Sequence, residues 1–296
     1  MEAVLTINDL TKFYGSIRAL NKVSFQVPAS CVFGILGPNG SGKTTLLGII
    51  MDILRPTSGT YQFFGKVPDA GTRKQIGTLL ETPNFYHYLS GERNLRIAAE
   101  IKGKGLNEID DVLKKVNLYE RRKSKFSTYS LGMKQRLAIA SCLLGNPGVL
   151  VFDEPTNGLD PVGIAQIRDL IKLLAKEGKT IIMASHLLDE VEKVCTHVAI
   201  LKTGDLITSG NVDEVLVNED IIEVGSSDLA RLEEVLNQMN GFTHLKNTGD
   251  LIQLFYPNGS SQPEQINKHC FDQGVVLNRI HVKKKSLETK FLELTK

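Results

Sequence analysis

The segment Gly37–Thr45 constrains the fold of this chain more than any other part of the sequence. It reads Gly-Pro-Asn-Gly-Ser-Gly-Lys-Thr-Thr and matches the whole phosphate-loop pattern G-x-x-x-x-G-K-[ST]. Its three glycines have no Cβ and tolerate positive φ, so successive backbone N–H groups can turn inward around phosphate oxygens. An apolar, strand-like run, Cys31–Leu36, precedes the loop, and a helix-forming run, Thr44–Ile53, follows it. The pattern therefore predicts a strand, an anion-binding loop and a helix whose N-terminal dipole favours that anion.

The loop is expected to bind a nucleoside triphosphate together with Mg²⁺. Lys43 can reach the β- and γ-phosphates, and the Thr44 hydroxyl can ligate Mg²⁺. A chance match to the pattern is expected in about one in a hundred chains of this length, so a plain glycine-rich turn is a poor alternative. We assign nucleotide binding to all residues of the loop: Gly37, Pro38, Asn39, Gly40, Ser41, Gly42, Lys43, Thr44 and Thr45.

Composition narrows the class of protein further. The 296 residues suit one large domain and a small one, and the net charge of +2 gives no reason to expect a nucleic-acid partner. No signal peptide is visible, and the longest apolar run, Leu46–Ile53, is far shorter than the ~18 residues that span a bilayer. We therefore expect a cytosolic protein, and any membrane role must come through a partner. Four well-separated cysteines are expected to be reduced and mostly buried: Cys31, Cys142, Cys195 and Cys270.

The first part of the chain alternates strands and helices. A helix at Val162–Lys176, flanked by strands at Gly148–Phe152 and Thr180–Ala184, gives the βαβ order of a parallel sheet. The pattern between Ser90 and Leu144 is helical, with Ser90 and Ser130 as caps. Further strands are expected at Ala3–Ile7, Val23–Val27 and Thr60–Phe64, and a closing hairpin at Val198–Leu201 and Leu206–Ser209. The helix after Ser130 is expected to place Met133, Leu137, Ala140, Ser141 and Leu144 on one face.

The first domain is expected to end near Val215, and a second pattern of strands and helices follows it. Its elements come in the order strand, helix, two strands, helix, strand, which is the order of a split βαβ, ferredoxin-like module, and a last helix is expected at Leu287–Leu294. The expected elements are Ile221–Val224, Leu229–Met239, Thr243–Lys246, Leu251–Phe255, Pro263–Gln273 and Val275–Val282. Nothing in this part resembles a catalytic cluster.

Two adjacent acids end the predicted strand at 148–152. Successive side chains along a strand point to opposite faces, so Asp153 and Glu154 cannot have the same role in the site. Asp153 is the natural Mg²⁺ partner alongside Thr44, and Glu154 is placed to hydrogen-bond an attacking water as general base. Alone, an apolar strand that ends in Asp-Glu is more often a solvated turn. Downstream of a phosphate loop it indicates hydrolysis.

These motifs together resemble the nucleotide-binding subunit of an ABC transporter over about residues 1–215. They are Tyr14, GPNGSGKTT (37–45), YSLGMKQR (129–136), VLVFDEPTNGLD (149–160) and ASH (184–186). The resemblance implies an α/β P-loop NTPase fold, an ABC cassette: a RecA-like core, an antiparallel β subdomain and a helical subdomain at about 83–145. Residues 216–296 would form the small α+β accessory domain.

The resemblance also assigns residues to an ATP site shared by two subunits. Ser130 and Gly132 stand where the signature serine and glycine contact the partner's ATP, although Ser130 alone would be a plain helix cap. His186 aligns with the histidine that contacts the γ-phosphate. Asp160 aligns with a loop at the dimer interface and equally suits the N-cap of the next helix. Tyr14 aligns with the aromatic that stacks on adenine, and a buried core tyrosine is the competing interpretation.

Two departures from the family pattern point to the branch of bacitracin- and lantibiotic-type drug exporters. The signature has Leu131 and Met133 where the family usually has glycine and glutamine. The position of the usual Mg²⁺-contacting glutamine is Glu81, whose carboxylate can reach Mg²⁺ or its waters but adds negative charge near the γ-phosphate. An exposed loop glutamate is the alternative for Glu81.

We therefore expect an ATPase that binds ATP and Mg²⁺, forms a homodimer around two ATP molecules and drives a separate transmembrane permease. It would lie in the cytoplasm, peripheral on the inner face of the cell membrane. The alternatives are a soluble ABC-type ATPase in remodelling or DNA/RNA-linked processes, and a kinase. The single cassette without sustained heptads argues against the first, and Glu154 next to Asp153 argues for water as the acceptor.

Overall fold

The computed structural model describes residues 3–80, 83–216, 220–257, 259–284 and 291. The chain forms two compact units, Met1–Val212 and Asp213–Lys296, which we describe separately. The division falls at the start of helix α8 (Val212–Leu216), close to the boundary predicted near Val215. No helix among the described residues is both long and apolar enough to cross a membrane.

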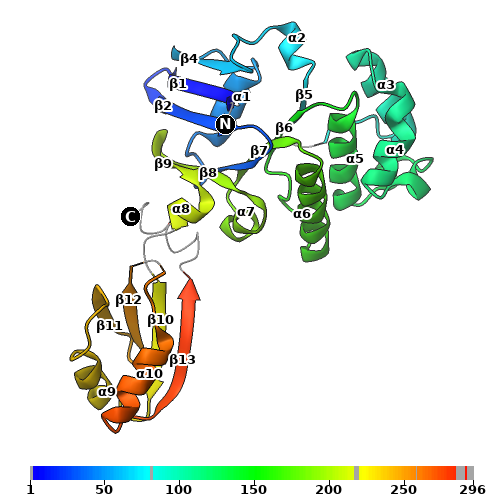
Figure 1. Ribbon diagram of the computed structural model, residues 1–296. Helices are drawn as coiled ribbons and strands as arrows, with labels where there is room; N and C mark the ends of the chain where they lie inside the picture. Colours follow the sequence, from blue (N-terminus) through cyan, green and yellow to red (C-terminus); the bar gives the residue numbers. More distant parts are fainter. Residues whose placement is uncertain (1–2, 81–82, 217–219, 258, 285–290, 292–296) are drawn as a thin grey trace. The chain divides into compact units, whose positions relative to one another are not determined.

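A six-stranded sheet forms the centre of the first unit (Figure 1). Its order is β5-β6-β7-β3-β8-β9; the first five strands are parallel, and β9 returns antiparallel to β8, which confirms the predicted hairpin. The strands are β3 (Val32–Leu36), β5 (Ile76–Leu79), β6 (Val149–Asp153), β7 (Thr180–Ser185), β8 (His197–Lys202) and β9 (Asp205–Asn211). Helices α1 (Lys43–Ile50), α2 (Ala70–Arg73), α6 (Pro161–Lys176) and α7 (Leu188–Val194) connect them.

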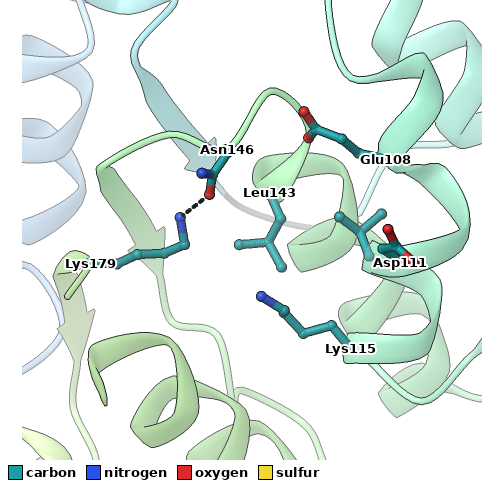
Figure 2. Close-up of a pocket in the computed structure, with 7 residues that line it drawn as sticks. Glu108, Asp111, Lys115, Leu143, Asn146 and Lys179 are labelled. Atoms are coloured by element: carbon teal, nitrogen blue, oxygen red, sulfur yellow. Dashed lines mark hydrogen bonds between the residues drawn. The ribbon is translucent and has the colours of Figure 1, made fainter. Parts of the chain in front are cut away.

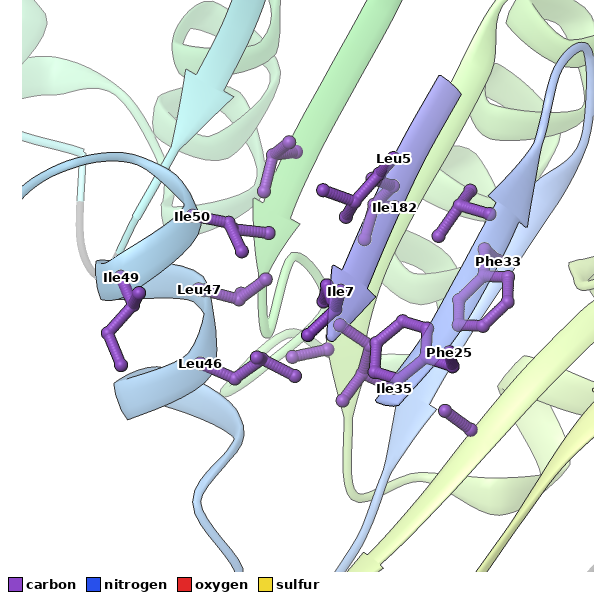
Figure 3. Packing of buried hydrophobic residues seen from close by; sticks show 14 of the residues in the cluster. Leu5, Ile7, Phe25, Phe33, Ile35, Leu46, Leu47, Ile49, Ile50 and Ile182 are labelled. Atoms are coloured by element: carbon purple, nitrogen blue, oxygen red, sulfur yellow. The ribbon is translucent and has the colours of Figure 1, made fainter. Parts of the chain in front are cut away.

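A second, antiparallel sheet packs against α1. It has the order β2-β1-β4, with β1 at Ala3–Tyr14, β2 at Ile17–Pro28 and β4 at Ser58–Phe63. Leu46 and Leu47 of α1 share one buried core with Ile7 of β1 and with residues of the parallel sheet (Figure 3). This core fixes the helix that follows the phosphate loop between the two sheets.

The two N-terminal strands are longer than their hydrophobic pattern predicts. The pairing of β1 with β2 shifts register between Ile7 and Leu10, where Asp9 has a φ of 47°. Such a bulge breaks the alternation of apolar residues in the sequence but lets the ladder resume, with Leu10 fully buried. Helix α1 is shorter than predicted, because Asp52 takes a φ of 60° and the Ile53 N–H bonds back to the Gly48 carbonyl.

Three helices lie together beyond the β5 edge of the parallel sheet (Figure 1). They are α3 (Gly91–Lys102), α4 (Ile109–Lys115) and α5 (Leu131–Leu143). Ser90 and Ser130 cap α3 and α5 through their hydroxyls, as predicted. Leu137 and Ala140 from the face predicted for α5 are buried. The other sides of the helix are buried as well, at Gln135, Ala138 and Cys142, because α3, α4, α6 and β5 surround it.

The second unit is an antiparallel sheet with two helices. Its strand order is β11-β12-β10-β13, and its chain order is strand, helix, strand, strand, helix, strand. The elements are β10 (Asp220–Ser226), α9 (Leu229–Leu236), β11 (His244–Asn247), β12 (Ile252–Tyr256), α10 (Pro263–Asp272) and β13 (Leu277–Lys284). A separate apolar core lies under its two helices. The helix predicted at Leu287–Leu294 falls, apart from Phe291, outside the described residues.

All four cysteines are free and buried, as the sequence predicts. Burial raises the pKa of Cys31 to about 11 and that of Cys142 to about 12, and it also raises the pKa of Cys195 and Cys270. Because the thiolate is the reactive form, we expect iodoacetamide to alkylate the native protein at pH 8 about two orders of magnitude more slowly than the urea-unfolded chain. Mass spectrometry of modified peptides over time measures the rates. One cysteine that reacts equally fast in both states would contradict its buried position.

Candidate functional site

The predicted chemical groups meet at one edge of the parallel sheet. Strands β6, β7 and β3 are neighbours, with Asp153 beside Ala184 and Leu36 beside Ser185. The carboxyl ends of parallel strands lie at the same edge, which is where open α/β sheets bind ligands. The phosphate loop after β3, the Asp153-Glu154 pair after β6 and His186 after β7 are thereby brought together.

The glycines of the loop are required for two different reasons. Gly40 and Gly42 have φ of 79° and 104°, a region that side-chain-bearing residues rarely adopt. Gly37 does not have positive φ, contrary to expectation. A Cβ there would lie 2.3 Å from Ser41 Oγ and 2.4 Å from the Leu201 carbonyl, so a glycine is needed because no side chain fits at this position.

The loop is supported by residues that its own motif does not reveal. A Cβ at Gly42 would lie 2.6 Å from the carbonyl oxygen of Ala19 in β2. The Gly204 N–H, in the turn between β8 and β9, donates to the Ser41 carbonyl at 3.1 Å. The Thr203-Gly204-Asp205 turn signal was visible in the sequence, but its position under the loop follows only from the sheet order.

Lys43 is buried at the centre of the loop, with 6% of its surface exposed. Its Nζ donates to the carbonyls of Gly37 at 2.8 Å and Pro38 at 3.2 Å and lies 3.8 Å from Glu154 Oε1. Burial lowers the pKa of Lys43, and the carboxylates of Glu154 and Asp153 oppose that shift. The ammonium is therefore held between the loop carbonyls and the acids at the end of β6.

Glu154 connects Lys43 with His186. Its Oε2 lies 2.8 Å from His186 Nδ1, and because a carboxylate only accepts, Nδ1 carries the hydrogen of that bond. The Glu154 backbone has a φ of 47°, unusual for a residue with a side chain, and its N–H donates to the Ala184 carbonyl on the neighbouring strand. Strained backbone of this kind costs about 1–3 kcal/mol and gathers at functional sites. Here it accompanies a carboxylate that faces both Lys43 and His186.

The same edge offers oxygen atoms that suit a phosphate and a hard cation. The hydroxyl of Ser41 is buried and has no hydrogen-bond partner among the described residues, which is unusual unless a ligand supplies one. Thr44 is exposed at the start of α1, and Asp153 is buried at the end of β6. No group of three or more His, Cys, Asp or Glu residues in the described ranges is arranged to hold a metal ion. Mg²⁺ needs no such cage, because it binds through one or two protein oxygens together with phosphates and waters.

Other predicted residues lie outside this cluster. Tyr14 is 44% exposed, so the interpretation as a buried core tyrosine is wrong. Ser130 and Gly132 lie at the N-terminus of α5, and no hydrogen bond or ion pair within the described residues joins them to the loop. Asp160 caps α6 by accepting from the Gly163 N–H at 2.8 Å. Glu81 lies outside the described residues.

A cavity of about 310 Å³ lies elsewhere, between α4 and the turns that precede β6 and β7 (Figure 2). Lys179 Nζ there donates to Asn146 Oδ1 and to the Pro147 carbonyl, both at 2.8 Å, and Lys115 pairs with Glu177 at 2.8 Å. None of the predicted site residues lines it. Its polar contacts tie α4 to the turns of the sheet.

Comparison with known proteins identifies the family. The family model described as ABC transporter matches residues 20–157. The bacitracin transport ATP-binding protein BcrA of Enterococcus faecalis is 35% identical over 99% of this chain and 97% of its own length. The chain belongs to the ABC transporter family.

Further relatives and solved structures agree. The lantibiotic transport ATP-binding protein SrtF of Streptococcus pyogenes is 36% identical over 74% of this chain and 99% of its own. A solved structure of the ATP-binding subunit of an ABC transporter superposes with a TM-score of 0.64 at 29% identity, over 72% of this chain and 91% of that one. A dimeric ATP-binding cassette bound to ADP and Pi gives a TM-score of 0.62 at 27% identity, over 70% and 98%. This chain is an ATP-binding ATPase subunit with the fold of an ABC cassette, as the motifs predict.

Proposed function

We propose that the chain hydrolyses ATP·Mg²⁺ at the edge formed by β3, β6 and β7 and uses the energy to drive a separate transmembrane exporter. The observation that carries this proposal is the convergence of Lys43, Glu154 and His186 beside the phosphate loop. Phosphoryl transfer depends mainly on positioning and electrostatic stabilisation, which this cluster supplies.

Each residue has a distinct proposed role. The backbone N–H groups of the loop hold the phosphates, and Lys43 moves from the carbonyls of Gly37 and Pro38 to the β- and γ-phosphates. Thr44 and Asp153 would hold Mg²⁺, which would neutralise phosphate charge. Glu154 orients the attacking water and accepts its proton.

The remaining side chains of the proposed site contact the nucleotide or its metal ion. The Nδ1–H of His186 bonds to Glu154, so its Nε2 edge is the one that can face the γ-phosphate. Tyr14, with its ring exposed, stacks on adenine. Glu81, which lies outside the described residues, would contact Mg²⁺ or its waters.

A second copy of the chain completes the proposed site. Ser130 and the free N–H groups at the N-terminus of α5 suit a γ-phosphate supplied by the partner's loop. The dimeric cassette with ADP and Pi supports this arrangement. Residues 213–296 are an accessory domain in this proposal.

The names of the relatives support a membrane exporter of peptide antibiotics or similar drugs as the transmembrane partner that this ATPase drives. The chain then works in the cytoplasm, attached to the inner face of the membrane through its permease. Copurification from native membranes with a transmembrane protein of this class tests the assignment, and a pure soluble complex would count against it.

The proposed site, completed by a second copy of the chain, predicts a specific effect of Gly132→Asp. A Cβ at Gly132 meets nothing within 4 Å in one chain, and an acidic residue is favourable in the first turn of a helix, so the variant should fold and bind ATP normally. Its carboxylate would repel the γ-phosphate of the partner, and we expect ATP hydrolysis to fall by about a hundredfold. Phosphate release and ATP-dependent dimerisation are the measurements.

Gly148→Asp is the matched control for this variant. Gly148 is equally open, does not have positive φ and lies just before β6, away from the N-terminus of α5. It should keep full activity. If Gly132→Asp hydrolyses ATP at the rate of the control, the γ-phosphate does not approach α5 and the shared site is wrong.

A further inference from the structure

The cavity of about 310 Å³ beside α4 has groups of opposite charge on its two sides (Figure 2). Lys179 and Asn146, from the turns that precede β7 and β6, lie on one side. Glu108, just before α4, and Asp111, in its first turn, lie on the other, and Leu143 of α5 lies between the two sides. We call this hollow the α4 cavity.

Lys179 is a buried cation without an anionic partner. Only 7% of its surface is exposed, and its Nζ donates to two neutral oxygens, Asn146 Oδ1 and the Pro147 carbonyl, both at 2.8 Å. An ammonium has three N–H donors, so one remains for a further acceptor. No carboxylate among the described residues forms an ion pair with Lys179. A buried charge is costly unless it is paired, which indicates that an anion completes this side of the cavity.

The surroundings of Lys179 favour such an anion. Burial lowers the pKa of Lys179 and the charge of Lys115 lowers it further, whereas Glu177 and Glu108 oppose these shifts. Lys115 also lines the cavity and pairs with Glu177 at 2.8 Å. An anion bound in the cavity would lie near both ammonium groups and would stabilise the charged form of Lys179.

Glu108, on the other side, has no charged partner either. Its Oε2 accepts from the Gly145 N–H at 2.8 Å, and no cation in the described ranges forms an ion pair with it. Its second oxygen can therefore accept from a ligand. Asp111 adds a second carboxylate, which is 81% exposed and lies 3.5 Å from Lys114. This side of the cavity suits a cation.

The space between the two sides is small and partly apolar. Lys179 and Glu108 form no ion pair with each other, since the cavity lies between them. Val112 and Leu143, with 7% and 4% of their surfaces exposed, contribute apolar wall. Ligand sites commonly measure about 300–1,000 Å³, so this cavity suits a small molecule. A ligand that satisfies both sides carries a negative group and a positive group on a short apolar body.

We propose that the α4 cavity binds a small aliphatic amino acid as its zwitterion. Its carboxylate accepts the third N–H of Lys179, and its ammonium donates to Glu108. Both bonds are charge-assisted, and the carbon chain lies against Val112 and Leu143. Such a ligand joins α4 to the turns before β6 and β7. This site is separate from the proposed ATP site, and its occupation does not depend on ATP hydrolysis.

Three probes with the same linear carbon chain test the pairing of charges on the full chain. They are ε-aminocaproate, which carries both charges, caproate, which has only the carboxylate, and hexylamine, which has only the ammonium. We expect ε-aminocaproate to bind with a Kd of about 1 mM and the other two about tenfold more weakly. Ligand-detected NMR titration without nucleotide measures the three affinities.

Glu108→Gln tests the cationic end of the ligand. Glutamine keeps an oxygen that can accept from the Gly145 N–H but removes the negative charge. We therefore expect ε-aminocaproate to bind this variant no more tightly than caproate does, while the affinity for caproate stays unchanged. Asp110→Asn is the matched control, because Asp110 is an exposed acid on α4 that does not line the cavity.

Lys179→Met tests the anionic end. Methionine is long and uncharged, so both carboxylate probes should bind about tenfold more weakly, and hexylamine should be unaffected. Lys115→Met provides the same test at a more exposed position if the buried change prevents folding. It removes a cation and leaves Glu177 unpaired, so it should also weaken both carboxylate probes. Lys172→Met, at an exposed position on α6, is the control.

Three results would overturn the inference. The first is the absence of saturable binding of ε-aminocaproate to the unmodified chain. The second is equal affinity for caproate and ε-aminocaproate, which would make the cavity a site for simple anions. The third is a preference for ε-aminocaproate that persists in Glu108→Gln, which would place the binding site elsewhere.

Discussion

Replacing Glu154 with Gln is expected to reduce ATP hydrolysis by about a thousandfold, while ATP binding is retained. Glutamine has nearly the same shape, so it can still accept a hydrogen bond from His186 Nδ1, which lies 2.8 Å from Glu154 Oε2. It cannot accept a proton from water. ATP should therefore stay bound and unhydrolysed, and the dimer around it should persist. Phosphate release and size-exclusion chromatography with ATP measure the two effects.

Glu190→Gln is a suitable control for this experiment. Glu190 is also a largely buried glutamate in ion pairs, with Arg168 at 3.3 Å and Lys193 at 3.1 Å, but it lies on α7 outside the cluster. It should retain hydrolysis. Hydrolysis at the normal rate in Glu154→Gln would rule out Glu154 as the general base and leave another group to activate water.

Replacing Gly42 with Ala is expected to weaken ATP binding by about a hundredfold and to remove hydrolysis with it. Gly42 has a φ of 104°, and an added Cβ would lie 2.6 Å from the Ala19 carbonyl of β2. Backbone cannot yield as a flexible side chain can, so the loop must shift, and its N–H groups lose their alignment on the phosphates. Calorimetric titration with ATP gives the affinity, and thermal unfolding gives the change in stability.

Gly15→Ala separates conformational strain from the steric clash. Gly15 has a φ of 59°, but no atom lies within 4 Å of its added Cβ. It should cost about 1 kcal/mol of stability and leave ATP affinity unchanged. Unaltered ATP affinity in Gly42→Ala would show that β2 does not hold the loop in its binding shape.

Features of the fold that depend on neighbours in the chain were predictable. Ser90, Ser130 and Asp160 cap helices because a side-chain oxygen reaches an N–H three residues later, whatever the rest of the protein does. The βαβ order and the closing hairpin were readable from periodicity and turn residues for the same reason. Burial on every side of a helix was not predictable in this way. The periodicity of α5 predicted which residues share one face, but the burial of its other sides depends on elements far apart in the sequence.

The sequence by itself determined the chemistry of this protein: a loop that can hold phosphates, an Asp-Glu pair at a strand end, a histidine after another strand and four well-separated cysteines. These follow from residue type and local spacing. Only the tertiary structure decided which groups meet. The strand order β6-β7-β3 places Glu154 between Lys43 and His186. Ser41 and the Leu201 carbonyl leave no room for a side chain at position 37, which is why a glycine is needed there. Helix α3 faces Lys123 and Lys125 across one groove. Such contacts join residues distant along the chain, and they exist only once the sheets and helices have packed.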